Sequence, residues 1–70
     1  DSVTTLVLLG GAYQATKDFG GARDALEEAI HINPFNPMIY QILYQAETAL
    51  GDAAGAQHAK ATLEKLMRPR

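Results

Sequence analysis

The sequence predicts an all-α fold, an α-solenoid in which two helix–turn–helix hairpins with four helices stack as a single domain over residues 1–70. The first observation is that the chain repeats itself with a period of 34 residues. The second is that apolar residues recur at three- and four-residue spacing, and the third is that a good capping residue precedes each expected helix. A period of this length is typical of stacked hairpins, because each hairpin buries its apolar face on its neighbour. The register pairs Leu9 with Leu43, Asp18 with Asp52, Gly21 with Gly55, Ala22 with Ala56, and Ala25 with Ala59.

The first repeat, residues 3–36, is expected to hold two helices. Ser2 can cap a helix from residue 3 to about residue 16, since its hydroxyl can accept a hydrogen bond from an early backbone amide. Asp18 can cap the second helix, from about residue 19 to residue 32. The apolar face of that helix consists of Ala22, Leu26, Ala29 and Ile30. Its opposite face carries Arg23, Asp24, Glu27, Glu28 and His31.

The segment Asn33–Pro37 is predicted to separate the two repeats. Pro34 disfavours helical geometry at the residue before it, which ends the second helix. The last two residues of the segment, an asparagine and a proline, suit the N-cap and the first position of a third helix. The second repeat therefore covers residues 37–70. We expect its helices to run to about Leu50 and, after a glycine turn and a capping aspartate, to about Met67.

The residues inside the period resemble a tetratricopeptide repeat. The family's tryptophan, leucine–glycine, tyrosine, alanine, aromatic and proline positions occur in order in the first repeat, with Leu6 for the tryptophan and Leu26 for the aromatic. The matching residues are Leu6, Leu9, Gly10, Tyr13, Ala22, Leu26, Ala29 and Pro34. The second repeat matches less well, since Tyr44 fills a small-residue position and Glu47 and Lys60 fill apolar ones. The resemblance implies a right-handed stack in which the first helix of each hairpin lines a concave surface.

The resemblance also bears on the turns and on the end of the array. Lys17 stands one period before Gly51, at a helix end where the family favours left-handed backbone. Glu47 and Lys60 occupy positions at which a following helix usually packs. Because both are charged, we expect a cap-like last helix with no further repeat after it.

The first helix is apolar on more than one side, because a run of four apolar residues cannot face one neighbouring helix alone. An upstream repeat would cover it, and so would a second copy or a partner helix. We therefore expect a self-association surface, and with it a homo-oligomer, at Leu6, Val7 and Leu8. Two repeats alone make a small core, whereas solenoids need about three units, so we expect a piece of a longer protein.

Composition excludes several classes of function. A formal net charge of −2 and a pI near 5.5 leave no basic surface for nucleic acid or anionic lipid. No apolar run is long enough to span a bilayer and no leader pattern is present, so we expect no membrane partner. The absence of cysteine excludes disulfides and thiol chemistry. It leaves the compartment unassigned, with the cytoplasm slightly favoured.

The sequence contains no pattern typical of a catalytic, metal or cofactor site. His31 and His58 have no histidine or cysteine near them in the sequence, so we expect no metal. Glu27 and Glu28 lie on an exposed helical face without the apolar surroundings that acid catalysis needs. The glycine pairs lack the lysine and serine of a phosphate loop. We therefore expect a non-enzyme without a cofactor.

The aromatic residues are interpreted as core rather than as a stacking platform for single-stranded nucleic acid, since no basic residues interleave with them. Tyr13, Phe19 and Tyr40 lie at positions that resemble the family's packing positions within a repeat. Phe35 lies between two prolines on a turn. It either plugs the seam between the repeats or forms an exposed contact.

By position, the resemblance implies a partner-binding groove on eight residues of the first and third helices. They are Thr4, Val7, Gly11, Gln14, Met38, Gln41, Gln45 and Thr48. None is charged, unlike the lysine, arginine and asparagine of the repeats that bind the acidic C-termini of heat-shock chaperones. Glutamine amides suit an extended backbone, while Val7 and Met38 offer adaptable apolar contact. We therefore expect a module that binds a neutral or apolar peptide or helix of a protein partner, with a plain spacer surface as the alternative.

Two other functions remain open at this point. One is a structural end piece that completes a longer array or joins two protomers through the first helix. The other is an accessory domain beside an enzyme in the same polypeptide. Upstream sequence distinguishes them, because further repeats there would favour the first and a catalytic domain the second.

Overall fold

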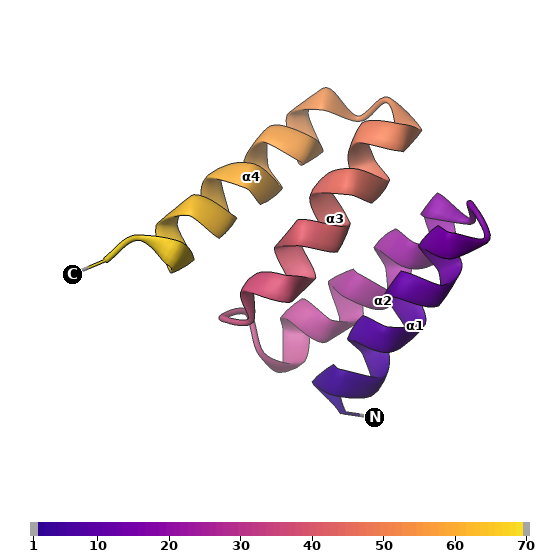
Figure 1. The fold of residues 1–70 in the computed structure, drawn as a ribbon, viewed down its shortest axis with the longest axis horizontal. Helices are drawn as coiled ribbons and strands as arrows, with labels where there is room; N and C mark the ends of the chain where they lie inside the picture. The colour runs from indigo at the N-terminus through magenta and orange to yellow at the C-terminus, as the bar shows by residue number, and fades with distance from the viewer. Residues whose placement is uncertain (1, 70) are drawn as a thin grey trace.

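The computed structural model describes residues 2–69 as four α-helices joined by short turns (Figure 1). The helices are α1 (Val3–Ala15), α2 (Phe19–Ile32), α3 (Pro37–Leu50) and α4 (Ala53–Met67). No strand occurs among these residues, so the predicted all-α class is confirmed. The predicted bounds agree with the structure to within about one residue. Residues 1 and 70, at the ends of the predicted domain, lie outside the part described.

Each helix begins directly after its predicted capping residue. In all four cases the cap's side-chain oxygen accepts a hydrogen bond from a backbone N–H in the first turn, and one such bond contributes about 1 kcal/mol. The bonds join Ser2 Oγ to Thr5 N at 3.2 Å, Asp18 Oδ1 to Gly21 N at 3.0 Å, Asn36 Oδ1 to Met38 N at 3.0 Å, and Asp52 Oδ1 to Gly55 N at 3.0 Å. The helix starts therefore follow from local chemistry.

The turns inside the two hairpins have the same backbone geometry. Lys17 and Gly51 both adopt left-handed backbone, with φ of 63° and 79°. The same two backbone hydrogen bonds close each turn. They run from Lys17 N to Gln14 O (2.9 Å) and Asp18 N to Tyr13 O (2.8 Å), and from Gly51 N to Thr48 O (3.1 Å) and Asp52 N to Glu47 O (2.9 Å). The left-handed position predicted for Lys17 is thus confirmed.

The turn between the hairpins is held by a tyrosine of α3. The hydroxyl of Tyr40 donates a hydrogen bond of 2.7 Å to the backbone oxygen of Pro34, and burial raises the pKa of this tyrosine. Phe35 is 73% exposed, so it does not plug the seam between the repeats. A buried side chain therefore fixes the turn, while the ring of Phe35 lies in solvent.

Packing follows chain order. α1 contacts α2, α2 contacts α3, α3 contacts α4, and α1 also contacts α3, whereas α4 contacts α3 alone. In Figure 1, α1 lies in front of α2, and α1 and α3 run in the same direction across the view. The extents of 37 × 28 × 17 Å describe a flat slab of about two helix layers. The two hairpins therefore lie side by side, and α4 forms one end.

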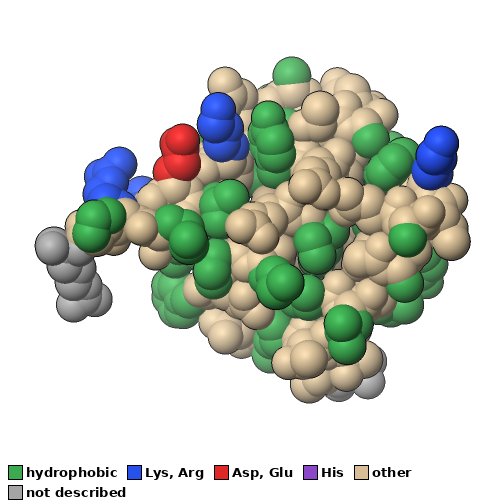
Figure 2. Space-filling view, viewed as in Figure 1, with side chains coloured by type: hydrophobic (Ala, Val, Ile, Leu, Met, Phe, Trp, Pro, Cys, Tyr) green, Lys and Arg blue, Asp and Glu red, His purple; other side chains and the backbone are tan. Residues whose placement is uncertain are grey.

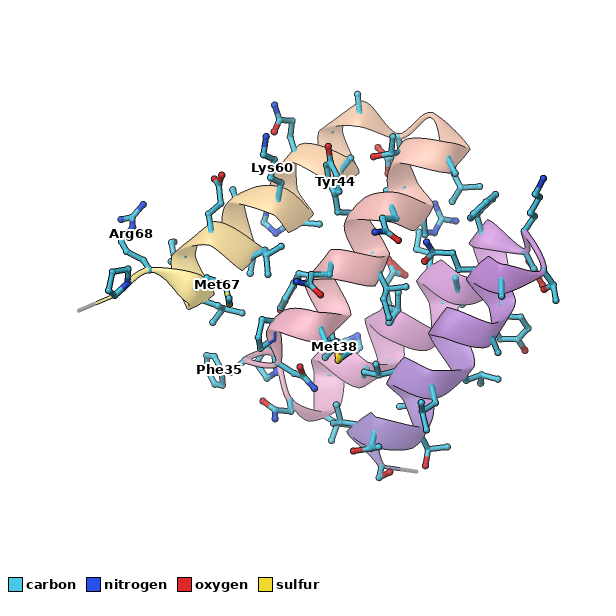
Figure 3. All side chains as sticks on the ribbon, viewed as in Figure 1. Phe35, Met38, Tyr44, Lys60, Met67 and Arg68 are labelled. Atoms are coloured by element: carbon cyan, nitrogen blue, oxygen red, sulfur yellow. The ribbon has the colours of Figure 1, made fainter. Side chains whose placement is uncertain are left out.

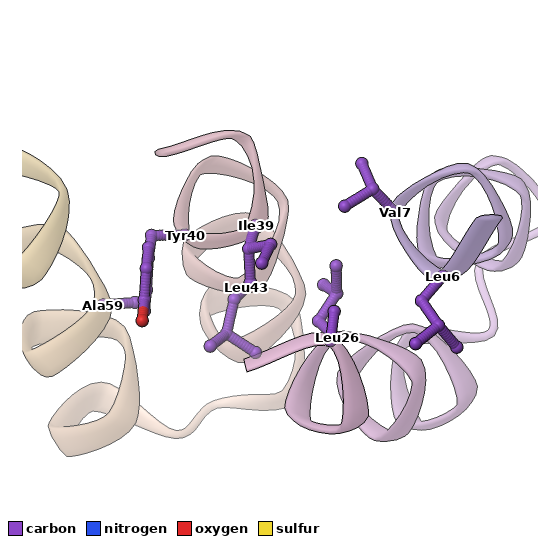
Figure 4. Close-up of a cluster of buried hydrophobic side chains, with 8 residues drawn as sticks. Leu6, Val7, Leu26, Ile39, Tyr40, Leu43 and Ala59 are labelled. Carbon is purple, nitrogen blue, oxygen red and sulfur yellow. The ribbon is translucent and has the colours of Figure 1, made fainter. Parts of the chain in front are cut away.

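The core is a single apolar cluster with contributions from all four helices (Figure 4). Its buried members are Leu6, Val7, Leu26, Ala29, Ile39, Tyr40, Leu43 and Ala59. Gly10 allows close approach here, since a Cβ atom on it would lie 2.9 Å from Leu26 Cδ2. Leu6 and Val7 are only 3% and 8% exposed, which corrects their assignment to a self-association surface. They face inward because α1 contacts both α2 and α3, so only Leu8 of the three predicted residues is exposed.

Candidate functional site

The residues predicted to line the groove lie on two helices that contact each other, α1 and α3. Five of the eight are exposed: Thr4, Met38, Gln41, Gln45 and Thr48. Gly11 and Gln14 are half-buried. Val7 is buried in the core, so it cannot supply the apolar contact to a partner that was expected of it. Met38 is the large apolar side chain that remains exposed in this set.

A hydrogen bond between two glutamines crosses from α1 to α3. Gln14 Nε2 donates to Gln45 Oε1, while the oxygen of the Gln14 amide is buried without a hydrogen-bond partner. Two of the three glutamines expected to contact a peptide therefore contact each other. Gln41 keeps its whole amide free for a ligand, and Gln45 keeps its N–H donors.

The surface around this set is nearly uncharged. Figure 3 places Met38 on the face turned to the viewer, and Figure 2 shows that face covered by hydrophobic side chains, uncharged side chains of other types and backbone. Lysine, arginine and acidic side chains appear at its edges. The neutral character expected of the groove residues thus extends over the visible face of the molecule.

The larger of the two described cavities lies between α3 and α4, beside the predicted groove. It has a volume of about 310 Å³. Its lining is Tyr44, Thr48, Gly51, Ala53, Ala56, Gln57 and Lys60. Only Thr48 was predicted as a site residue. Figure 3 shows Tyr44 and Lys60 side by side where α3 and α4 face each other. The other six lining residues each have a counterpart 34 positions earlier in the sequence, so the repeat period is the signal that relates them to the first hairpin.

A smaller cavity of about 240 Å³ opens between α1 and α2. Its lining is Leu9, Tyr13, Gly21, Asp24, Ala25 and Glu28, and it shares no residue with the predicted groove. Leu9 is partly exposed at its edge and Leu8 is 70% exposed on the same helix. The outer side of α1 therefore remains apolar even though its inner side is covered.

Glu47 is a buried carboxylate inside the second hairpin. It is 7% exposed, and its Oε1 atom has no hydrogen-bond partner. Burial raises the pKa of Glu47; Asp52 and Glu27 add to the rise, while Arg23 and His58 oppose it. The sequence placed Glu47 with Lys60 at the charged end of the array. In the structure Lys60 is exposed, and Glu47 lies within the hairpin.

The described residues show neither a metal site nor a membrane segment. Residues 2–69 contain no group of three or more histidine, cysteine, aspartate or glutamate side chains arranged to hold a metal ion. None of the four helices has the length and apolar character that crossing a bilayer requires. Comparisons of the chain with protein-family models, with curated proteins and with solved structures gave no match.

Proposed function

We propose that this chain is a protein-interaction module, a tetratricopeptide-like solenoid of two hairpins that binds a neutral or apolar peptide or helix across α1 and α3. The observation that carries the proposal is the lack of charge on the exposed positions of this surface, from Thr4 on α1 to Thr48 on α3. The neutral face in Figure 2 supports it.

The absence of cations on this surface selects against acidic ligands. An acidic peptide would lose solvation at its carboxylates and gain no charge-assisted hydrogen bond, each of which contributes about 1.5–3 kcal/mol where it forms. A neutral segment loses less solvation. It can pair backbone groups with the Gln41 amide and pack apolar side chains on Met38. The preferred ligand is therefore an uncharged segment with a few apolar residues.

A peptide-array screen followed by titration tests this function. The best neutral peptide should bind the wild-type chain and lose at least about tenfold in affinity with Gln41→Glu, because the new charge faces a ligand that cannot pair it. Gln41 takes no part in the Gln14–Gln45 bond, so the fold should persist, as circular dichroism would show. His31→Glu on the exposed side of α2 is the matched control and should leave affinity unchanged. Loss of binding in the control, with retention in Gln41→Glu, would place the partner elsewhere.

A structural role is the second candidate, and the exposed outer side of α1 favours it. Leu8 and Leu9 are large apolar residues in solvent on one helix, a feature typical of a surface covered by another chain or repeat. Sedimentation at about 100 μM separates the two forms of this role, since micromolar self-association would be visible there. A dimer abolished by Leu8→Lys would establish homodimerisation. A monomer would leave the longer array as the structural alternative.

A further inference from the structure

Glu47 is a buried ionisable group that takes no part in the surface across α1 and α3. It is 7% exposed, and its Oε1 atom has no hydrogen-bond partner. One period earlier the same position holds Tyr13, and the capping residues Asp18 and Asp52 correspond in the same way. The second hairpin therefore has a carboxylate where the first has an aromatic ring.

The carboxylate of Glu47 lies against the first turn of α4. A Cβ atom on Gly55 would lie 2.5 Å from Glu47 Oε2 and 2.5 Å from Asp52 Oδ2, so the two acidic side chains converge on one backbone position. Asp52 is the N-cap of α4, and its other oxygen accepts a hydrogen bond from Gly55 N at 3.0 Å. In the first hairpin a ring carbon of Tyr13 takes this place beside Gly21. Two carboxylates therefore meet at the start of α4 and not at the start of α2.

Charged groups from three parts of the chain face Glu47. α2 contributes Arg23 and Glu27, the turn before α4 contributes Asp52, and α4 contributes His58. α1 contributes none, because its sequence contains no charged residue. Burial raises the pKa of Glu47, the two acidic neighbours add to the rise, and the arginine and the histidine oppose it. The packed arrangement therefore favours the neutral form of this side chain.

The contact between α3 and α4 is the one that holds α4. α4 contacts α3 alone, whereas α1, α2 and α3 contact one another. Opening of α4 moves its first turn away from Glu47 and lets water solvate the carboxylate, so the ionised form favours the open state. A proton on Glu47 Oε2 removes the repulsion between the two acidic side chains and places a hydrogen-bond donor next to Asp52 Oδ2.

We propose that Glu47 is a pH-dependent switch for the docking of α4: its neutral carboxyl keeps the helix packed on α3, and its carboxylate weakens that packing. Docking weakens as pH rises from 4.5, the ordinary pKa of the side chain, through the raised pKa of the docked state. Below and above this window Glu47 adds no pH dependence. The surface across α1 and α3 stays formed, since those helices contact each other without α4, so the switch is independent of the binding function proposed above.

Amide hydrogen exchange of the 70-residue chain between about pH 4 and pH 8 tests the switch. After correction for the intrinsic pH dependence of exchange, the opening constant of α4 should rise by up to about tenfold per pH unit within the window, because opening then releases one proton. Glu47→Gln should abolish the rise and keep α4 docked throughout. A rise that persists in Glu47→Gln would overturn the proposal. So would pH-independent opening of α4 in the unaltered chain, which would show that α4 does not control the proton.

The two N-cap aspartates provide a matched pair of variants. Asparagine caps a helix about as well as aspartate, so Asp52→Asn and Asp18→Asn should both keep the fold. Asp52→Asn removes the like charge beside Glu47 and should reduce the rise in α4 opening, whereas Asp18→Asn, beside Tyr13, should leave it unchanged. Equal effects of the two variants would contradict the proposal.

A titration of the unaltered chain checks the switch without any variant. The carboxyl carbon of Glu47, followed by nuclear magnetic resonance, should titrate with a midpoint above 4.5. A midpoint at or below this value would overturn the proposal, because the docked state would then not favour the neutral form.

Discussion

The two hairpins have the same backbone but different surfaces. Both begin each helix with a side-chain cap, and both close their inner turn with the same two backbone hydrogen bonds and one left-handed residue. They differ at matched positions that face a neighbour. The first hairpin has Gly10 and Leu26, where the second has Tyr44 and Lys60.

The difference shows which parts of a repeat are needed for its own fold and which serve its neighbour. Caps and turns satisfy backbone groups within one hairpin, so both hairpins keep them. Gly10 and Leu26 fit against each other beneath α3, and a larger residue at Gly10 would collide with Leu26. In the second hairpin no described helix covers the corresponding positions, so a tyrosine and a lysine fit there. The residue type at these positions therefore depends on whether a neighbouring helix covers them.

Truncating the matched pair at Leu26 and Lys60 has the largest expected effect. Leu26→Ala should lower the free energy of unfolding by about 2–5 kcal/mol, because the side chain is fully buried and its loss leaves a cavity. Lys60→Ala should change it by less than about 0.5 kcal/mol, because the side chain is exposed. Urea denaturation followed by circular dichroism measures both. Equal losses would break the comparison by showing that both hairpins are covered at this position.

Glu47, which stands where the first hairpin has Tyr13, should make stability depend on pH. Its pKa is raised from the ordinary value of 4.5, so the folded state binds a proton more tightly than the unfolded state. Its destabilising contribution therefore appears as pH rises from about 4.5 through the folded pKa, and it is absent at lower pH. Glu47→Gln should thus raise the free energy of unfolding by about 1 kcal/mol at pH 7 and much less near pH 4.

Denaturation of the wild type and the variant at both pH values measures this difference. Glu28→Gln, which alters an exposed carboxylate on α2, controls for the change in net charge. If Glu47→Gln raised the free energy of unfolding equally at pH 4 and pH 7, the gain would come from side-chain packing and not from removal of a buried charge.

The inner turns give the smallest effect and the sharpest symmetry test. Lys17→Gly should raise the free energy of unfolding by up to about 1 kcal/mol, since left-handed backbone is unfavourable for a residue with a side chain. Gly51→Lys should lower it by a similar amount. The double variant exchanges the two residues and should lie near the wild type if the turns are equivalent. A lower denaturation midpoint for Lys17→Gly would show that they are not.

Features set by neighbours in the sequence were predictable. The caps at Ser2 and Asp52 and the left-handed backbone at Lys17 depend on residues within one helical turn, and the structure confirms them. Helix bounds follow from the same signals. The resemblance to a tetratricopeptide repeat, and the partner-binding groove that it implies, remain predictions.

Features set by distant residues were not predictable. The burial of Val7 depends on the approach of α3, and the Gln14–Gln45 bond joins residues 31 apart in sequence. Glu47 was predicted at the charged end of the array because its position is one at which a following helix usually packs, yet the structure buries it to 7% exposure. The α3–α4 cavity could not be predicted from the sequence, because it depends on how α3 and α4 pack against each other.

The contacts of α4 bear on how cooperative the molecule is. α1, α2 and α3 each contact at least two other helices, but α4 contacts one. Opening α4 therefore breaks a single interface, and its amide protons should exchange with solvent by local opening while the other three helices stay folded. A further helix packed against α3 and α4 would give α4 a second interface. Such a helix would join the last helix to the cooperative unit of the domain.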